Sequence, residues 1–355
     1  MPLRDVFVEI TRNTRPPTRA GFGLPLILTE ATGGGNYTTY RGLDQVETDY
    51  ADTTDAYRMA AQIWAQDPQV ERVAIAAVDS TTTPTASDYE TMLDALVLED
   101  WYFLLLTTED APITTAVSNY INGVGATQEE RIKLLFVRQE STTLASALGD
   151  QDRTAAFYLV DAGHFPEAAW VGKCAPALPG SQTWKFKTLE SALPLAVPEP
   201  FEPVSISTNN LADLHDPNEG NGSQNTYVSK MGYLQTSEGL VTSGEYIDVM
   251  RGLDFVRIRI EEGITRLLAE TPKVPMTNPG IAMVLAEVEA VMQVATQQGI
   301  IATDGDGNGI WAVTGPTRDE VSESDRAART LRDVEFTLEL AGAVHVVYVS
   351  GVVRV

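Results

Sequence analysis

Oxygen-bearing side chains at alternating positions make the run DGDGNG the segment best suited to hold a metal ion. Asp304, Asp306 and Asn308 occupy positions 1, 3 and 5 of an EF-hand-like calcium loop, and Gly309 occupies position 6, where the chain must turn sharply. Position 12 should supply a bidentate glutamate, but that residue is Gly315. Because Asp, Gly and Asn also favour simple turns, a turn is the plainer interpretation. We therefore assign no metal and keep Asp304, Asp306 and Asn308 as the calcium candidate.

Three arginines near the end of the chain are spaced to contact an acidic partner. Arg326, Arg329 and Arg332 follow Ser324, which can cap a short helix over 324–332. Their spacing puts at least the first two guanidinium groups on one helix face. The alternative is a solvated face that is paired with neighbouring carboxylates, and the spacing favours neither interpretation.

Residues that could act as bases or nucleophiles are few. The chain has three histidines, His164, His215 and His345, and a single cysteine, Cys174. No histidine lies in a metal-binding spacing, and the sequence has no G-x-S-x-G elbow and no phosphate-binding loop. One cysteine excludes an internal disulfide framework, and we interpret it as a small buried residue.

A hydrolase is the rival interpretation, and it would need an aspartate, a histidine and a serine to be brought together. His164 and His215 would be its candidate bases, but neither lies in a recognisable motif. We therefore predict that the protein is not an enzyme, with no catalytic or cofactor-binding residues and no cofactor.

The charge of the chain is strongly negative and unevenly distributed. The net charge is −24, with +2 over residues 1–20, −21 over 21–250 and −5 over 251–355. Binding to nucleic acid or to an anionic membrane needs clustered Lys and Arg, so we expect neither partner.

We see no apolar run that approaches the roughly 20 residues of a membrane helix. The first residues lack the apolar region of a signal peptide, so we expect the chain to stay in the cytoplasm where it is made.

Apolar strands alternate with helices through the first half of the chain. The predicted strands are 22–29, 70–78, 101–107, 132–137 and 155–160, and the predicted helices are 53–65, 87–98 and 112–122. We interpret 32–40 as a loop and Ser87 as the cap of the second helix. Strands separated by helices of this length favour an α/β fold, with a mostly parallel sheet covered on both faces.

A proline-rich stretch at 194–203 marks a candidate boundary, after which the pattern changes. The elements predicted beyond it are a small β-region at 226–241, long helices at 246–268 and 279–298, a short strand at 310–313, and the arginine-bearing helix. We interpret this part as an α+β C-terminal domain.

Both ends of the chain are expected to be strands that need a partner. Asp5–Ile10 alternates as a short strand, and Val344–Val355 (VHVVYVSGVVRV) follows a second strand-like segment, Val334–Leu340, across a tight reversal at Ala341-Gly342. An exposed strand rich in β-branched residues is a template for pairing with another chain. The predicted subunit-linking residues are Val6, Val8, Ile10, Val344, Val346, Tyr348, Val349 and Val352.

Several segments resemble contractile phage tail sheath proteins. The strongest resemblances are in EYIDVMRGLDF (245–255), in LLAETPKVPMTNPG (267–280) with the helix that follows it to Gly299-Ile300, and in the C-terminal segment SESDRAARTLRDVEFTLELAGAVHVVYVSGVV (322–353). Residues 42–68, 70–78 and 225–232 also resemble the family. The resemblance is strong over 225–355 and looser over 100–200.

The resemblance implies a structural protein with a subtilisin-like sheath middle domain and a C-terminal domain with strand arms. It implies a linking arm at 1–20, an outward-facing α/β domain at 21–200, a tube-proximal domain at 201–340 and a linking strand at 341–355. Copies would form stacked hexameric rings around a tail tube and contract to drive the tube through a cell envelope. The implied partners are further copies, the tube protein, which Arg326, Arg329 and Arg332 would face, and the baseplate and terminator proteins. The implied location is a virion or tailocin tail, assembled in the bacterial cytoplasm.

Overall fold

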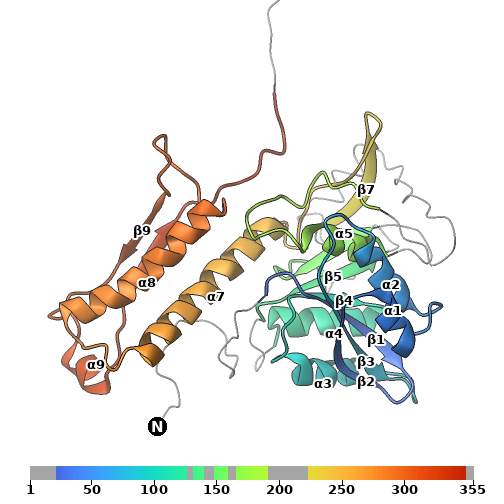
Figure 1. The fold of residues 1–355 in the computed structure, drawn as a ribbon, viewed down its shortest axis with the longest axis horizontal. Coiled ribbons are helices and arrows are strands. Elements are labelled where there is room, and N and C mark those ends of the chain that lie inside the picture. The colour runs from blue at the N-terminus through green and yellow to red at the C-terminus, as the bar shows by residue number, and fades with distance from the viewer. Residues whose placement is uncertain (1–20, 126–130, 140–147, 159–164, 191–222, 349–355) are drawn as a thin grey trace, which may run out of the picture.

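A computed structural model describes residues 21–125, 131–139, 148–158, 165–190 and 223–348. The predicted strand at Asp5–Ile10 and the proline-rich boundary at 194–203 lie outside these residues. Figure 1 shows an α/β body on one side and a pair of long helices with a small sheet on the other.

The body is built on an eight-stranded sheet with the order β2-β3-β1-β4-β5-β6-β7-β8. Neighbouring strands from β3 to β7 in this order are parallel, whereas β2 and β8 at the two edges are antiparallel. The strands are β1 (Pro25–Ala31), β2 (Gly35–Tyr40), β3 (Val73–Asp79), β4 (Phe103–Leu106), β5 (Leu134–Gln139), β6 (Thr154–Tyr158), β7 (Gln224–Lys230) and β8 (Tyr233–Thr236). The predicted mostly parallel α/β sheet is confirmed.

Helices cover both faces of this sheet, because alternate residues of each strand point to opposite sides. Leu26 and Leu28 of β1 pack with α3 and α4, whereas Ile27 packs with α2 and α5. All three side chains are fully buried. The helices of the body are α1 (Leu43–Asp49), α2 (Asp55–Trp64), α3 (Ala86–Leu96), α4 (Ala111–Asn122) and α5 (Pro166–Cys174).

The sheet extends beyond the predicted domain boundary at residue 200. Strands β7 and β8, which we assigned to the C-terminal domain, complete the large sheet through parallel pairing of Ala156–Tyr158 with Gln224–Thr226. Asn225 stabilises the junction, since its side-chain nitrogen donates to Ala156 O at 3.1 Å and Leu240 O at 2.7 Å. Pairing across about seventy residues leaves no local signal, so the sequence showed only a separate β-region.

Two local predictions in the body are wrong. Residues 35–40 form the edge strand β2, where we expected a loop, because the pairing with β3 outweighs the weak strand pattern of a glycine-rich segment. Thr85 precedes α3, where we expected Ser87 to cap it, and Asp88 Oδ2 accepts from Thr85 N at 2.8 Å. Helices α1 and α5 were not predicted.

The C-terminal part consists of two long helices and a two-stranded sheet. Helices α7 (Ile247–Glu270) and α8 (Asn278–Gln297) pack side by side, and β9 (Trp311–Thr314) and β10 (Glu335–Leu338) form the small sheet beside α8. A short helix, α9 (Glu323–Ala328), lies between the two strands in sequence. The predicted α+β character of this part is confirmed.

Helix α8 is, within the part of the chain described, the one helix long and apolar enough to cross a membrane by length and composition. This differs from our expectation of no such segment. Its residues Ile281, Val288 and Met292 are buried in the core, and Glu287 Oε2 accepts from Arg266 of α7 at 3.0 Å. A core helix of a soluble protein meets the same test.

Candidate functional site

A buried ionic cluster joins α7 to the sheet. Asp254 of α7 accepts two hydrogen bonds from Arg153, both at 2.8 Å, and a third from the Tyr102 hydroxyl at 2.7 Å. The exposed fraction is 3% for Arg153 and 1% for Asp254. A bidentate pair of this kind constrains both distance and orientation. Because Arg153 precedes β6 and Tyr102 precedes β4, the cluster ties α7 to the two strands that flank β5 in the sheet.

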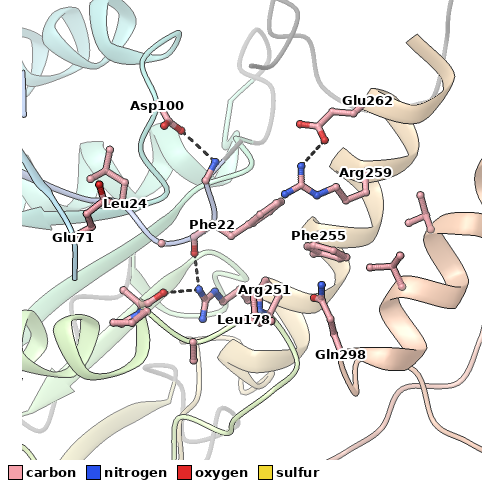
Figure 2. A pocket seen from close by; sticks show the side chains of 18 of the residues that line it. Phe22, Leu24, Glu71, Asp100, Leu178, Arg251, Phe255, Arg259, Glu262 and Gln298 are labelled. Carbon is pink, nitrogen blue, oxygen red and sulfur yellow. Dashed lines mark hydrogen bonds and ion pairs between the residues drawn. The ribbon is translucent and has the colours of Figure 1, made fainter. Parts of the chain in front are cut away.

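Arg251, one helical turn before Asp254, makes a second attachment. Its guanidinium group donates to three carbonyl oxygens: Phe22 at 2.6 Å, Ala175 at 2.9 Å and Cys174 at 3.1 Å. Figure 2 shows Arg251 pointing from α7 to the start of the chain's described part at Phe22. Burial lowers the pKa of Arg251 to about 10, so it stays charged at neutral pH.

These two attachments make α7 a rigid joint between the body and the C-terminal part. Buried charges are costly unless they are paired and hydrogen-bonded, and here each guanidinium group has several partners. A rotation of α7 would separate Arg153 from Asp254 inside the protein interior. We therefore call Tyr102, Arg153, Arg251 and Asp254 the α7 joint.

The sequence carries a signal for the α7 joint in the spacing of residues that also form the motif resembling the sheath family. Ile247, Arg251, Asp254 and Phe255 are spaced to lie on one face of a helix, and that face is buried. A charged pair at core positions of an amphipathic helix indicates buried partners elsewhere in the chain.

A cleft of about 840 Å³ lies beside the α7 joint, between the body and the α7–α8 pair. Its apolar lining includes Phe22, Leu178 and Phe255. Its charged lining forms ion pairs across short distances: Arg259 with Glu262 at 2.5 Å, Arg266 with Glu287 at 3.0 Å and Arg72 with Asp100 at 3.9 Å. Paired charges of this kind do not form a constellation for acid–base or nucleophilic chemistry.

The small sheet has two open edges within the part of the chain that the structure describes. Strands β9 and β10 pair with each other in the register Glu335↔Thr314 to Leu338↔Trp311, and no other described strand pairs with either. Phe336 on β10 is 44% exposed. The unpaired edge of a strand presents backbone groups that can accept another strand.

The segment after β10 leaves the small sheet instead of folding back on it. We expected a reversal at Ala341-Gly342 to pair the two closing strands, but β10 pairs with β9. Residues 344–348 form no strand, and the exposed fractions are 75% for Val344, 63% for Val346 and 96% for Tyr348. Figure 1 shows this part of the chain, in dark red, crossing from the side of α8 towards the body and then turning outward. Five of the predicted linking residues, Val6, Val8, Ile10, Val349 and Val352, lie outside the described residues.

The arginine-bearing helix is shorter than predicted. Helix α9 ends at Ala328, and Arg329 adopts a left-handed conformation with φ of 57°, so Arg332 lies beyond the helix. The cap is Ser322, whose hydroxyl accepts from Asp325 N at 3.0 Å, where we expected Ser324. The sequence RAART offers no glycine to mark this end, which explains the longer prediction.

The three predicted contact arginines therefore differ in their surroundings. Arg326 donates to Val321 O at 2.5 Å and to Arg318 O at 3.2 Å, and Arg332 pairs with Asp325 at 3.1 Å. Arg329 is exposed at the end of the helix. Arg329 and Arg332 lie at the surface, and Arg326 is half-buried.

The calcium candidate forms a self-satisfied turn. Asp304 Oδ1 accepts from Asn308 N at 2.8 Å and from Asp306 N at 3.0 Å, and these bonds lower the pKa of the Asp304 carboxyl. No group of three or more His, Cys, Asp or Glu residues in the described part of the chain is arranged to hold a metal ion. We continue to assign no metal here, and Asp304, Asp306 and Asn308 stay an untested calcium candidate.

Of the single cysteine and the three histidines, Cys174 and His345 lie in the described part of the chain. Cys174 is fully buried, and burial raises the pKa of its thiol to about 12, so it is an inert thiol at neutral pH. His164 and His215 lie outside the described residues. His345 accepts or donates one hydrogen bond with Thr183 at 3.0 Å.

The mostly parallel α/β sheet and the C-terminal part with its small antiparallel sheet match the fold of solved contractile sheath structures. Residues 247–353 match the family model of the E217 tail sheath protein gp31-like C-terminal domain. This region of the chain is therefore similar to the C-terminal domain of tail sheath proteins, and the predicted resemblance is confirmed.

Solved structures extend the likeness over the whole chain. The anti-feeding prophage helical sheath in the contracted state is similar with a TM-score of 0.69 at 12% identity, covering 99% of each chain. The sheath complex of an extracellular contractile injection system (PVC), also contracted, gives a TM-score of 0.67 at 12% identity, covering 99% of this chain and 98% of that one. A chain of the anti-feeding prophage baseplate gives 0.70 at 12% identity, with full coverage of both. No curated protein sequence matches the chain.

Proposed function

We propose that this protein is the sheath subunit of a contractile injection system, polymerising as stacked hexameric rings around a tail tube and contracting to drive the tube through a target envelope. One observation carries the proposal. Among the described residues, β9 and β10 pair with no further strand, and the exposed apolar residues 344–348, which follow the bridge of Leu340 with Ile301, have no strand partner. Strand addition between copies would satisfy both. A head-to-tail contact that does not close on itself grows into a helical assembly.

The α7 joint supports movement of each subunit as one body. During contraction the subunits must change their mutual contacts while the chain continues through the linking segments. Because the Arg153–Asp254 pair is buried and bidentate, rotation at α7 is costly, and the linking segments are the softer part. The sequence shows no nucleotide-binding motif, so the free energy would come from additional subunit contacts in the contracted state.

The remaining assignments follow from the same proposal. Residues 1–20 and 341–355 are the linking arms, and the acidic body faces outward. Arg326, Arg329 and Arg332 face the tube, with Arg329 as the most available of the three. Partners are further copies, the tube protein, the baseplate and the terminator, within a virion or tailocin tail assembled in the bacterial cytoplasm.

Deletion of residues 344–355 tests the proposal directly. The shortened chain should remain folded, because Val344, Val346 and Val347 are all more than half exposed, but it should form no sheath-like cylinders. Negative-stain electron microscopy of the full chain and the deletion is the measurement. Cylinders of normal appearance from the deleted chain would contradict the linking role.

A fluorophosphonate probe, which labels reactive serines, tests the hydrolase alternative, and we expect no serine labelling.

A further inference from the structure

One residue of the exposed C-terminal segment is held by the body. The side chain of His345 is 11% exposed, although Val344 and Val346 on either side are 75% and 63% exposed. A single buried side chain between exposed neighbours shows that the segment touches the body at one point. The binding of this histidine therefore determines where the segment leaves the body.

The point of contact is a socket made by three separate stretches of chain. The imidazole ring packs edge-on against Tyr246, with centroids 4.9 Å apart, and against Phe186 at 5.9 Å. Its Nε2 lies 3.0 Å from Thr183 Oγ1. Glu238, which forms an ion pair with Lys185, lies 3.7 Å from Nδ1. We call Thr183, Lys185, Phe186, Glu238 and Tyr246 the His345 socket.

Two details show that the socket is built and not a chance contact. Phe186 has φ of +65°, a left-handed conformation that is unfavourable for a bulky side chain, and this conformation places its ring against His345. Thr183 Oγ1 accepts from Lys185 N at 3.3 Å and also forms the 3.0 Å hydrogen bond with His345 Nε2, so the hydroxyl links the ring to the backbone of the socket. Nδ1 faces Glu238 and makes no hydrogen bond with any described residue.

We propose that the His345 socket holds the root of the C-terminal linking segment on its own subunit and fixes the direction in which Val346 and the following residues leave it. A fixed root reduces the conformational entropy that the segment loses when it pairs with a neighbour, because fewer orientations have to be searched. The linking role of the segment rests on the function proposed above, whereas the docking of His345 is a property of the single chain.

The charges around the socket make docking sensitive to pH. Burial and the Lys185 ammonium lower the pKa of His345 below its usual value, while Glu238 opposes this shift. Tyr246 is the other titratable group in contact, and it is flanked by the carboxylates of Glu245 and Asp248. Because the docked pKa is lower than the free one, docking is complete above the free pKa and weakens as the pH falls below it.

A distance measurement between spin labels tests the proposal on the unassembled subunit. Cysteines replace the exposed residues Val347 and Thr188, and the inert Cys174 does not compete for the label. At about pH 8 the parent should give a narrow distance distribution, which should broaden at about pH 5. His345→Ala should broaden it at both pH values, and His345→Gln, which does not titrate, should show no pH-dependent broadening.

The control variant is Val344→Ala, at an exposed position of the same segment, and it should leave the narrow distribution unchanged. An equally broad distribution in the parent and in His345→Ala at about pH 8 would overturn the proposal. The proposal would also be overturned if Val344→Ala broadened the distance distribution as much as His345→Ala does. Since the labels report on single subunits, a narrow distribution without sheath assembly would uphold the socket and contradict the proposed function alone.

Discussion

Arg153 and Asp254 lie 101 residues apart in sequence and form a two-point hydrogen-bonded ion pair with both distances at 2.8 Å. The pair joins the start of a central strand to the first half of α7. Its position explains why an aspartate occurs on the buried face of α7, just as the carbonyl contacts of Arg251 explain the arginine on that face. The residues 251–254, which resemble a tail sheath motif, thus attach α7 to the body.

Asp254→Asn should strongly destabilise the protein. The substitution leaves the Arg153 guanidinium buried without its counter-charge, which costs about 3–5 kcal/mol in comparable buried pairs. The measurement is the free energy of unfolding from urea denaturation. The matched control is Asp319→Asn, whose exposed pair with Arg318 should contribute far less. Equal losses in both variants would contradict the joint.

Gly172→Ala should destabilise the packing of α5 on α2. A Cβ atom at this position would lie 2.5 Å from Ile63 O and 2.7 Å from Ile63 Cα, which are backbone atoms that cannot rotate away. Forced repacking of this kind costs about 1–3 kcal/mol. Thermal unfolding measures the loss, and Gly305→Ala, with no atom within 4 Å of its Cβ, serves as the control. Unchanged stability for Gly172→Ala would show that the two helices can separate.

Glu167→Gln should change how stability depends on pH. Burial raises the pKa of the Glu167 carboxyl to about 7, against a value of 4.5 for an unburied glutamate, and Arg138 partly offsets this rise. The folded state thus binds this proton more tightly than the unfolded state, so stability from Glu167 is present below pH 4.5 and is lost as the pH rises through about 7.

The glutamine carries no charge and should remove this contribution. We expect the variant to be more stable than the parent at about pH 8 by roughly 1–3 kcal/mol, with a difference that shrinks as the pH falls. Urea denaturation between about pH 5 and pH 8 measures the difference. A constant difference across this range would show that Glu167 does not titrate between the two states.

Arg329→Glu should weaken assembly of the sheath around the tube. Arg329 is exposed at the end of α9, whereas Arg326 and Arg332 are engaged within the subunit. We expect fewer or shorter tails by electron microscopy, and a smaller effect from Arg58→Glu, a partly exposed arginine on α2 of the body. Normal tail yield and length with Arg329→Glu would remove this residue from the tube contact.

The sequence predicted the sheet because its central strands are local and strongly patterned. The buried run around Leu26–Leu28 indicates a strand whatever lies next to it. The same reasoning failed where distant pairing decides the structure, as for β7, whose partner is β6. It also failed at Arg329, where a non-glycine residue adopts positive φ and ends α9 early.

The candidate site was harder to predict than the fold. The exposed valines of the C-terminal segment were evident from composition, but the single contact of His345 depends on Phe186 and Tyr246, which are distant in sequence. The α7 joint depends likewise on Arg153 and Tyr102. Such contacts arise only after the strands are in order, so the residue spacing within α7 could indicate a buried partner but not its identity.

The open edges of β9 and β10, together with the exposed valines that follow them, have a consequence for the newly made chain. Under the proposed linking role, each free molecule would carry both a strand donor and a strand acceptor, a combination that favours self-aggregation. The net charge of −24 gives free copies a mutual repulsion that slows such encounters. Ordered growth of such an assembly would require a starting surface that presents the first acceptor edge before spontaneous polymers form, and the yield of correct particles would depend on how fast that surface captures subunits.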